Sequence, residues 1–409
     1  MPSYRLLLLL LGVAVSFRIA AADPPQTVTD PADAEVVSET EVKVVELAAS
    51  EAKVPVVKDD GKSWTSFRGD PLATGQAKSV LPDDPTLLWK YEVKNGAFES
   101  TPIVVEGVCY VPDLDGTLHA IGLDDGKAKW TKKTGAFSFA ASPAYRNGRM
   151  YVGDIDGIFY CFDLKGKEVW RFEPKDGGIE INSSATFYGD KLLYGSQDAV
   201  LYCLNTDSGK LEWKLPVEDQ IRCSPTVVSD RSFVAGCDGQ LHIVDIKKGE
   251  EAASVPIDAP TGTTPAVMGG HVYFGTEYGE FFKIDWKTAK IEWRFREKRP
   301  REIRSSAAVN AKVVVFGSRS KNVYGVNPAD GNEMWKYTCK RGVDSSPVIT
   351  GDNVVVASSD GRIYLLNWLT GKEVWKKETG DSFASSPAVV DGRLLIASND
   401  GVVYCFGKK

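Results

Sequence analysis

One motif recurs about every 40 residues along most of the chain, and this period limits the folds that the chain can adopt. Its clearest marker is a tryptophan near the end of each unit, with one gap that the spacing places at Ala253. Counting the gap, successive markers are 40 to 43 residues apart, which gives eight units. The markers are Trp89, Trp130, Trp170, Trp213, Trp293, Trp335 and Trp375.

The stretch from Gly342 to Gly380 shows what one unit contains. Four short runs rich in Val, Ile, Tyr and Trp are separated by turn pairs of the kind that tight hairpins need. Four strands per period of 40 to 45 residues are typical of a β-propeller blade. A Ser or Thr followed by Pro or Ala begins the first strand of each unit, and this second marker also counts eight. Its positions are Thr101, Ser142, Ser184, Ser224, Thr264, Ser306, Ser346 and Ser386.

The two markers are out of phase at the ends of the repeat region. The chain stops in a third strand, Val402 to Phe406, so the eighth unit lacks a fourth strand of its own. Leu87 to Tyr91 is a fourth strand with no unit before it, and its pairing with the last unit would leave no exposed sheet edge. The sequence therefore predicts an all-β, eight-bladed propeller of four-stranded antiparallel blades, closed by the strand around Trp89.

Residues before the repeats divide into three segments. Residues 1–22 have the charged start, the apolar run of 12 and the small-residue cleavage site of a secretory signal peptide. Residues 23–60 carry ten acidic residues and three Lys, which predicts a disordered acidic linker. Residues 61–84 form a lead-in segment, and residues 85–409 form the propeller. No Cys precedes Cys109, so we expect a soluble exported protein of the periplasm or extracellular space, not a lipoprotein, with no membrane segment after cleavage.

The lead-in segment holds two aromatic residues, Trp64 and Phe67, in polar surroundings. We expect this segment to dock on the outside of the propeller. The tripeptide beginning at Arg68 resembles an adhesion motif, but a packed turn explains these residues better.

Charge argues against nucleic acid as a partner. Residues 1–22 contribute two Arg and residues 23–60 a net charge of −7, so the rest of the chain carries −1 of the total −6. A nucleic-acid surface would need a clustered excess of Lys and Arg.

We find no catalytic constellation. The three histidines, His119, His242 and His271, have no metal-ligand spacing, and the recurring Asp-Gly pairs are explained by one repeated turn. We therefore predict no catalytic residue and no metal site.

Of the seven cysteines, three, namely Cys161, Cys203 and Cys405, occupy equivalent third-strand positions, where core packing explains them. Cys223 and Cys237 flank one hairpin, but strand parity points their side chains to opposite faces, which disfavours a disulfide.

Residues just before each first strand should meet at one mouth of the central channel. In a four-stranded meander, this connection and the loop between the second and third strands emerge on the same face. The eight positions are Glu99, Ala140, Asn182, Arg222, Gly262, Arg304, Asp344 and Ala384. Five of them are polar or charged, and these five, Glu99, Asn182, Arg222, Arg304 and Asp344, are the candidate binding residues. Two interpretations stay open, namely a solvated rim of self-neutralising pairs and a binding mouth.

The repeat unit, as in Ser345 to Trp375, resembles the repeat of the pyrroloquinoline-quinone-type (PQQ-like) propellers, and the resemblance covers residues 85–409. That family includes quinoprotein alcohol and glucose dehydrogenases and the non-enzymatic lipoprotein BamB, a scaffold in outer-membrane protein assembly. The segment from Trp64 to Gly69 also resembles the start of exported PQQ-like proteins.

The resemblance implies different chemistry for the two branches. The dehydrogenases hold PQQ against a vicinal Cys-Cys pair and a bound Ca²⁺ with a catalytic Asp, whereas no two cysteines are adjacent here. The extra tryptophans, Trp286 and Trp368, lie in turns on the face opposite the mouth and cannot serve as its stacking floor. This sequence matches the features of the scaffold branch better than those of the dehydrogenases, although the lipidated Cys of that branch is absent here.

The sequence thus favours an exported, non-catalytic, BamB-like propeller in the cell envelope. We expect it to be a monomer, to hold no cofactor, and to bind a protein partner through its loop face. The alternative is a PQQ-dependent quinoprotein dehydrogenase that uses PQQ and Ca²⁺; a third option is a carbohydrate or peptide binder.

Overall fold

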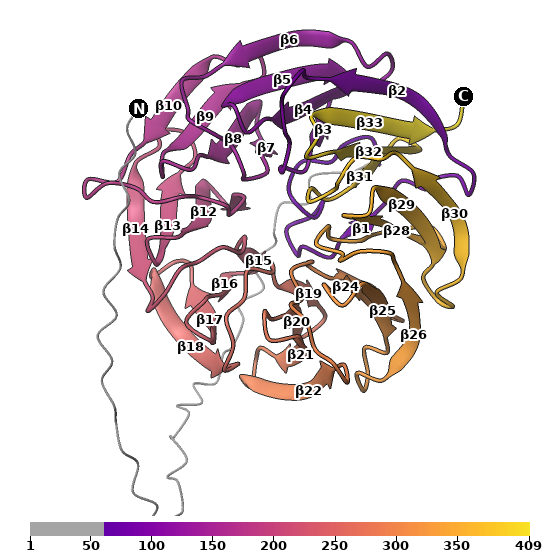
Figure 1. The fold of residues 1–409 in the computed structure, drawn as a ribbon. Coiled ribbons are helices and arrows are strands. Elements are labelled where there is room, and N and C mark those ends of the chain that lie inside the picture. Colours follow the sequence, from indigo (N-terminus) through magenta and orange to yellow (C-terminus); the bar gives the residue numbers. More distant parts are fainter. Residues whose placement is uncertain (1–60) are drawn as a thin grey trace, which may run out of the picture. The chain divides into compact units, whose positions relative to one another are not determined.

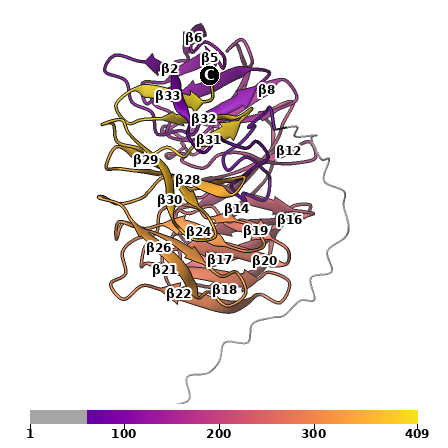
Figure 2. The same cartoon turned by 90° about the vertical axis from the view of Figure 1, so that its right-hand side faces the viewer.

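The computed structural model describes residues 61–409, which form a closed ring of eight blades around a central channel (Figure 1). All regular structure in this range is β-strand. Figure 2 shows the ring from the side, with the strands running from one face to the other. The predicted fold class is therefore confirmed. The predicted signal peptide (1–22) and acidic linker (23–60) lie outside the described residues.

Each blade is an antiparallel meander whose first strand lies innermost. Blade 1 has strands β3 (Ile103–Val105), β4 (Val108–Pro112), β5 (Thr117–Gly122) and β6 (Ala128–Lys133). Blade 2 has β7 (Ala144–Arg146), β8 (Arg149–Gly153), β9 (Phe159–Asp163) and β10 (Glu168–Phe172). Blade 3 has β11 (Thr186–Tyr188), β12 (Lys191–Ser196), β13 (Val200–Asn205) and β14 (Leu211–Pro216). Blade 4 has β15 (Thr226–Val228), β16 (Arg231–Ala235), β17 (Gln240–Asp245) and β18 (Glu250–Pro256).

The second half of the ring repeats this order. Blade 5 has β19 (Ala266–Met268), β20 (His271–Gly275), β21 (Glu280–Asp285) and β22 (Lys290–Arg296). Blade 6 has β23 (Ala308–Val309), β24 (Val314–Gly317), β25 (Asn322–Val326) and β26 (Glu333–Thr338). Blade 7 has β27 (Val348–Thr350), β28 (Asn353–Ser358), β29 (Arg362–Asn367) and β30 (Glu373–Glu378). Blade 8 has β31 (Ala388–Val390), β32 (Arg393–Ala397) and β33 (Val402–Gly407).

The fourth strand of blade 8 comes from the other end of the propeller sequence. Strand β2 (Thr86–Glu92) pairs antiparallel with β33, so that Trp89 lies opposite Cys405 and Lys90 opposite Tyr404. Figure 1 shows the indigo and yellow ends of the described chain side by side. The predicted closure is confirmed, and it joins sequence positions more than 300 residues apart.

The marker tryptophans connect neighbouring blades. The indole Nε1 of Trp335 donates to the backbone carbonyl of Trp368, in the last turn of the next blade, at 2.8 Å. A Cβ added to Gly371 would lie 2.6 Å from the same indole, so only glycine lets the ring pack this closely. The corresponding pairs are Trp89–Leu123, Trp130–Leu164, Trp170–Thr206, Trp213–Ile246 and Trp293–Pro328.

The gap in the tryptophan series has a structural counterpart. Ala253 and Ala289 pack against the same buried cluster, and Ala289 replaces the usual glycine of the turn in blade 5, with a φ of 54°. Buried Trp286 packs in the same cluster, with its ring 5.5 Å from that of Phe233. The indole of Trp286, in the turn of blade 5, therefore contributes to the core at the place where blade 4 has Ala253 instead of a tryptophan.

A ring of hydroxyl groups ties the first strands together. In seven of the eight steps around the ring, the backbone N–H that begins one blade donates to the Ser or Thr hydroxyl that begins the next. The step from Ser386 N to Thr101 Oγ1, at 3.2 Å, joins blade 8 to blade 1. This explains why the second sequence marker is a hydroxyl residue in every unit. The other donors are Thr101, Ser184, Ser224, Thr264, Ser306 and Ser346.

The lead-in segment lies inside the ring, and the expectation that it docks on the outside is wrong. Its backbone bonds to seven blades, and strand β1 (Gln76–Ala77) adds a parallel fifth strand to blade 7 (Figure 1). Seven backbone N–H groups of the blades would have no hydrogen-bond partner if the channel were empty, which would be costly. Carbonyl groups of the lead-in segment accept hydrogen bonds from them. The lead-in residues and their partners are Gly61–Asp391, Trp64–Val104, Thr65–Tyr145, Pro71–Val227, Leu72–Val267, Thr74–Val309 and Gly75–Ile349.

Arg68 holds the lead-in segment in the channel. Its guanidinium is buried and donates to the carbonyls of Ala307 (3.0 Å) and Pro347 (2.5 Å), in blades 6 and 7. Burial lowers the pKa of Arg68 to about 9, and the charge of Asp70 opposes the shift, so the group stays charged at neutral pH. The tripeptide from Arg68 to Asp70 is thus part of a packed turn.

The described cysteines, all seven, are free thiols. Cys161, Cys203 and Cys405 are buried in hydrophobic clusters, as the core-packing interpretation predicts. Burial raises the pKa of the Cys203 thiol to about 12, so it is not a thiolate at neutral pH.

Trp335→Ala should lower the free energy of unfolding by about 3–5 kcal/mol, because it empties a buried contact between blades 6 and 7. Met334→Ala is the control, since Met334 precedes Trp335 in the same strand and is 40% exposed. Urea unfolding followed by circular dichroism measures both variants. A loss below about 1 kcal/mol for Trp335→Ala would show that the indole does not stabilise the blade interface.

Gly75→Ala should destabilise the protein by about 1–3 kcal/mol more than Gly107→Ala. Both glycines have positive φ (62° and 73°), but a Cβ at Gly75 would lie 1.9 Å from Arg68 Nη2, whereas Gly107 faces open space. The difference between the two unfolding free energies isolates the packing of the lead-in segment. Equal losses would contradict its placement in the channel.

Candidate functional site

All eight positions before the first strands line one cavity at the mouth of the channel. The cavity has a volume of about 600 Å³. Its lining includes the five candidate binding residues and, at the other three positions, the small residues Ala140, Gly262 and Ala384. The structure therefore brings together Glu99, Asn182, Arg222, Arg304 and Asp344, although they come from five different blades.

The lead-in segment and the hydroxyl ring form the deeper part of this cavity. Phe67 lines it, and so does the hydroxyl residue that begins each blade. Since the lead-in backbone bonds to the first strands of most blades, the channel is occupied beneath the mouth. The mouth is thus a blind cavity with a conformationally fixed base.

Two arginines of the mouth are paired with carboxylates. Arg222 contacts Glu277 at 3.5 Å and donates to Gln220 at 2.7 Å. Arg319 makes a bidentate pair with Asp344, with distances of 2.9 and 2.8 Å. The pairing with Asp344 raises the pKa of Arg319.

Sequence reasoning missed Glu277, Arg319 and Gln197, which lie on the loops between second and third strands. These loops emerge on the mouth face, and each of the three residues lies two positions after a glycine near the end of the second strand, namely Gly195, Gly275 and Gly317, so an alignment on these glycines would have found them.

A polar chain lines the mouth at blade 3. Asn182 donates from Nδ2 to Glu180 at 3.0 Å and accepts from Gln197 Nε2 at 2.5 Å. These bonds fix the amide orientation of Asn182 and keep Glu180 in the mouth.

Three charged groups in the mouth lack an ionic partner. Among residues 61–409, no ion pair joins Glu99, Glu180 or Arg304 to any other group. Desolvation in the cavity and the like charge of Glu180 raise the pKa of Glu99. The mouth therefore contains two neutralised pairs on blades 4 to 7, the unpaired Arg304 at blade 6, and uncompensated acidic groups on blades 1 and 3. The interpretation as a rim of self-neutralising pairs applies to only part of it.

His242 supports the mouth loop of blade 4. Its Nε2 lies 2.8 Å from Asp238 and its Nδ1 2.5 Å from Glu251. Burial opposes the charged imidazolium, but the two carboxylate hydrogen bonds outweigh it and raise the pKa of His242 to about 9. The same Asp238 also accepts from the backbone N–H of Gln240, as expected of a turn residue.

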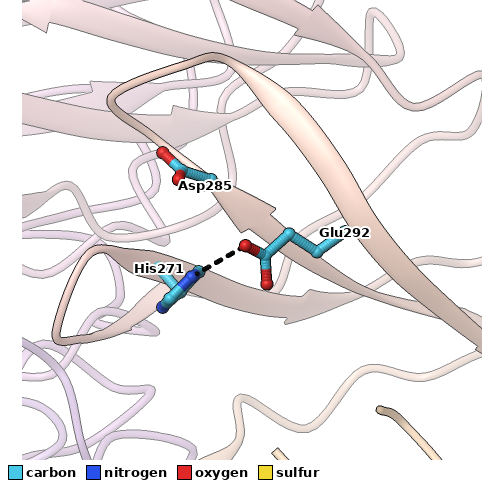
Figure 3. Close-up of side chains that lie close together, drawn as sticks. All are labelled: His271, Asp285 and Glu292. Atoms are coloured by element: carbon cyan, nitrogen blue, oxygen red, sulfur yellow. Dashed lines mark hydrogen bonds and ion pairs between the residues drawn. The ribbon is translucent and has the colours of Figure 1, made fainter. Parts of the chain in front are cut away.

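One group of described residues could hold a metal ion, although the sequence predicts no such site. His271, Asp285 and Glu292 place one ligand atom each within 4.8 Å of one another. Figure 3 shows His271 joined to Glu292, with no interaction reaching Asp285. Lys283 Nζ lies 2.7 Å from Glu292, so an ammonium already neutralises this carboxylate, and Asp285 accepts from the backbone N–H of Lys287. We assign no metal to this group.

Eight closed four-stranded blades around a plugged channel define the class of this protein as a β-propeller. A family model described as outer membrane protein assembly factor BamB matches residues 29–182, 73–224, 156–252 and 219–409. The chain therefore belongs to this PQQ-like, BamB-type propeller family.

Relatives in this family share modest sequence identity. The chain is 25% identical over 270 residues to the outer membrane protein assembly factor BamB of Salmonella typhimurium, an alignment that covers 62% of this chain and 60% of the relative. The BamB of Shewanella oneidensis is 23% identical over 239 residues, with 42% of this chain and 60% of the relative covered. The chain thus spans about three fifths of the length of these relatives.

Solved structures of both branches share the fold. BamB from Moraxella catarrhalis superimposes with a TM-score of 0.67 at 18% identity, covering 79% of this chain and 100% of that one. Quinohemoprotein alcohol dehydrogenase from Comamonas testosteroni gives a TM-score of 0.72 at 16% identity, covering 85% and 81%. At these identities the likeness shows the fold alone.

Stability should fall as the pH rises through the pKa of His242. A pKa raised in the folded state contributes stability that is present below the unfolded value of 6.5 and is lost above about 9. The full contribution is about 3 kcal/mol. Urea unfolding at pH 6 and pH 9.5 should show a larger loss for the wild type than for His242→Gln. The same loss in both proteins would contradict this account.

Proposed function

We propose that this chain is an exported, non-catalytic propeller that binds a protein partner through the face around the mouth. The chain belongs to a family whose model is described as an outer membrane protein assembly factor, and this membership supports a binding role. Export rests on the predicted signal peptide. Within residues 61–409, no helix is long and apolar enough to cross a membrane.

The observation that carries this proposal is the contrast between two positions of the repeat that lie two residues apart. The position that begins each first strand is Ser or Thr in all eight blades, and in seven of them its hydroxyl accepts a hydrogen bond from the neighbouring blade. Two residues earlier, the position facing the mouth holds six residue types, including both charges. Structural need alone would favour uniformity there too, whereas recognition of a ligand favours individual side chains.

A quinone cofactor fits this mouth poorly. PQQ carries several carboxylates and needs a stacking surface and a cation near its reactive carbonyl. Phe67 offers a ring, but Arg304 is the one mouth arginine without a carboxylate partner among the described residues. The unpaired Glu99 and Glu180 would face an anionic cofactor in the same cavity. We therefore derive no redox step from this site.

Partner binding should depend on the mouth arginines. Affinity capture from envelope extracts of the source cells with the wild type should retain a specific protein, and Arg222→Ala with Arg304→Ala should reduce its retention at least about fivefold, as expected for lost charged contacts. Lys312→Ala is the control, because Lys312 lies on a turn of the opposite face. Retention unchanged by the mouth substitutions would contradict the proposal.

The dehydrogenase alternative is tested directly. The purified protein, incubated with PQQ and Ca²⁺, should show neither stoichiometric cofactor binding nor alcohol-driven dye reduction. Tight stoichiometric binding with turnover would overturn the non-catalytic assignment.

A further inference from the structure

We propose that the part of the mouth formed by blades 1 to 3 receives a basic side chain, Lys or Arg, of the protein partner. This acidic sector consists of Glu99, Ala140 and Glu180, which line the cavity, and of the apolar rim formed by Phe137 and Ile179, which are exposed on the connections that lead to Ala140 and Glu180. The inference rests on the proposed function and names the chemistry by which the partner is recognised.

The first argument is charge. Four carboxylates line the cavity, and those on blades 5 and 7, Glu277 and Asp344, each contact an arginine. Glu99 and Glu180 have no such cation among the described residues, and desolvation, followed by the like charge of Glu180, raises the pKa of Glu99. Two uncompensated carboxylates within a cavity stabilise any cation placed between them. The acidic sector therefore attracts a positive group that the chain itself does not supply.

The second argument is the space between these carboxylates. Glu99 precedes blade 1 and Glu180 precedes blade 3, while the equivalent position of blade 2, between them, is Ala140. A methyl side chain leaves the gap open, whereas Arg222 and Arg304 fill the corresponding positions of blades 4 and 6. An incoming side chain can thus reach the carboxylates without displacing a protein group.

The third argument is the apolar rim of the same sector. Phe137 and Ile179 lie on the connections from blade 1 to 2 and from blade 2 to 3, and they are 69% and 52% exposed. Ile179 directly precedes Glu180 in the chain. Lys and Arg combine an aliphatic stem with a charged tip, which matches an apolar rim above acidic groups. A hydrated inorganic cation has no apolar part that could pack against such a rim, so the geometry favours a Lys or Arg side chain.

The test uses the full-length protein and two acetylated, amidated hexapeptides that differ only in one central residue, Lys or acetyl-Lys. Calorimetry or NMR titration at low salt measures their binding. The Lys peptide should bind, and the acetyl-Lys peptide should bind at least about 10-fold more weakly, the effect of losing one charge-assisted contact. Equal binding of the two peptides, or no binding of either, would overturn the inference.

Matched variants locate the site. The double variant Glu99→Gln, Glu180→Gln should bind the Lys peptide at least about 10-fold more weakly than the wild type. Glu106→Gln, on the opposite face of blade 1, should leave the affinity unchanged. Thermal unfolding checks that the variants stay folded, and Glu180→Lys should abolish binding by placing a cation in the sector. Saturable Ca²⁺ binding that needs the two glutamates and excludes the Lys peptide would overturn the inference in favour of a metal site.

Capture from extracts separates this inference from the proposed function. If the wild type retains a partner and the double variant Glu99→Gln, Glu180→Gln retains it equally, the acidic sector is not the contact and the inference fails, while the proposed function stands. If the partner is retained by the wild type and lost by this variant, with Glu106→Gln unaffected, both are supported.

Discussion

The pairing of β2 with β33 is the interaction on which the rest of the structure depends. A single four-stranded blade cannot bury both of its faces, so each depends on two neighbours, and blades 1 and 8 become neighbours only when the ring closes. Closure also completes the hydroxyl ring through Ser386 and Thr101. The mouth follows from it, because eight separate connections converge on one cavity only around a closed channel.

The lead-in segment gives this channel one open mouth. It bonds to the first strands of most blades, and its buried arginine reaches the carbonyls of Ala307 and Pro347. Phe67 then becomes part of the cavity lining. A ligand in the mouth would contact the connections between blades and the lead-in segment, on a base that backbone bonds to seven blades hold in place. This arrangement suits selective contact with a partner better than passage through the ring.

Features that repeat could be predicted from the sequence, and features that do not repeat could not. The tryptophans, the hydroxyl residues and the eight mouth positions recur at a fixed period, so their structural role could be inferred from spacing alone. The lead-in segment occurs once. Trp64 and Phe67 indicated that it packs, but whether against the outside or the inside of the ring depends on a channel that exists only after closure. The contacts of Arg319 with Asp344 and of Arg222 with Glu277 link loops of different blades, and no local pattern marks them.

Site-specific photo-crosslinking in living cells tests the central claim, that the mouth is the recognition face. A photoreactive residue placed at Ala140 or Ala384, in the mouth, is compared with one at Val80, which is 63% exposed and packs near the Gly351 turn on the opposite face. The account predicts an adduct with one and the same protein from both mouth positions and none from Val80. An adduct from Val80 with none from the mouth would contradict it.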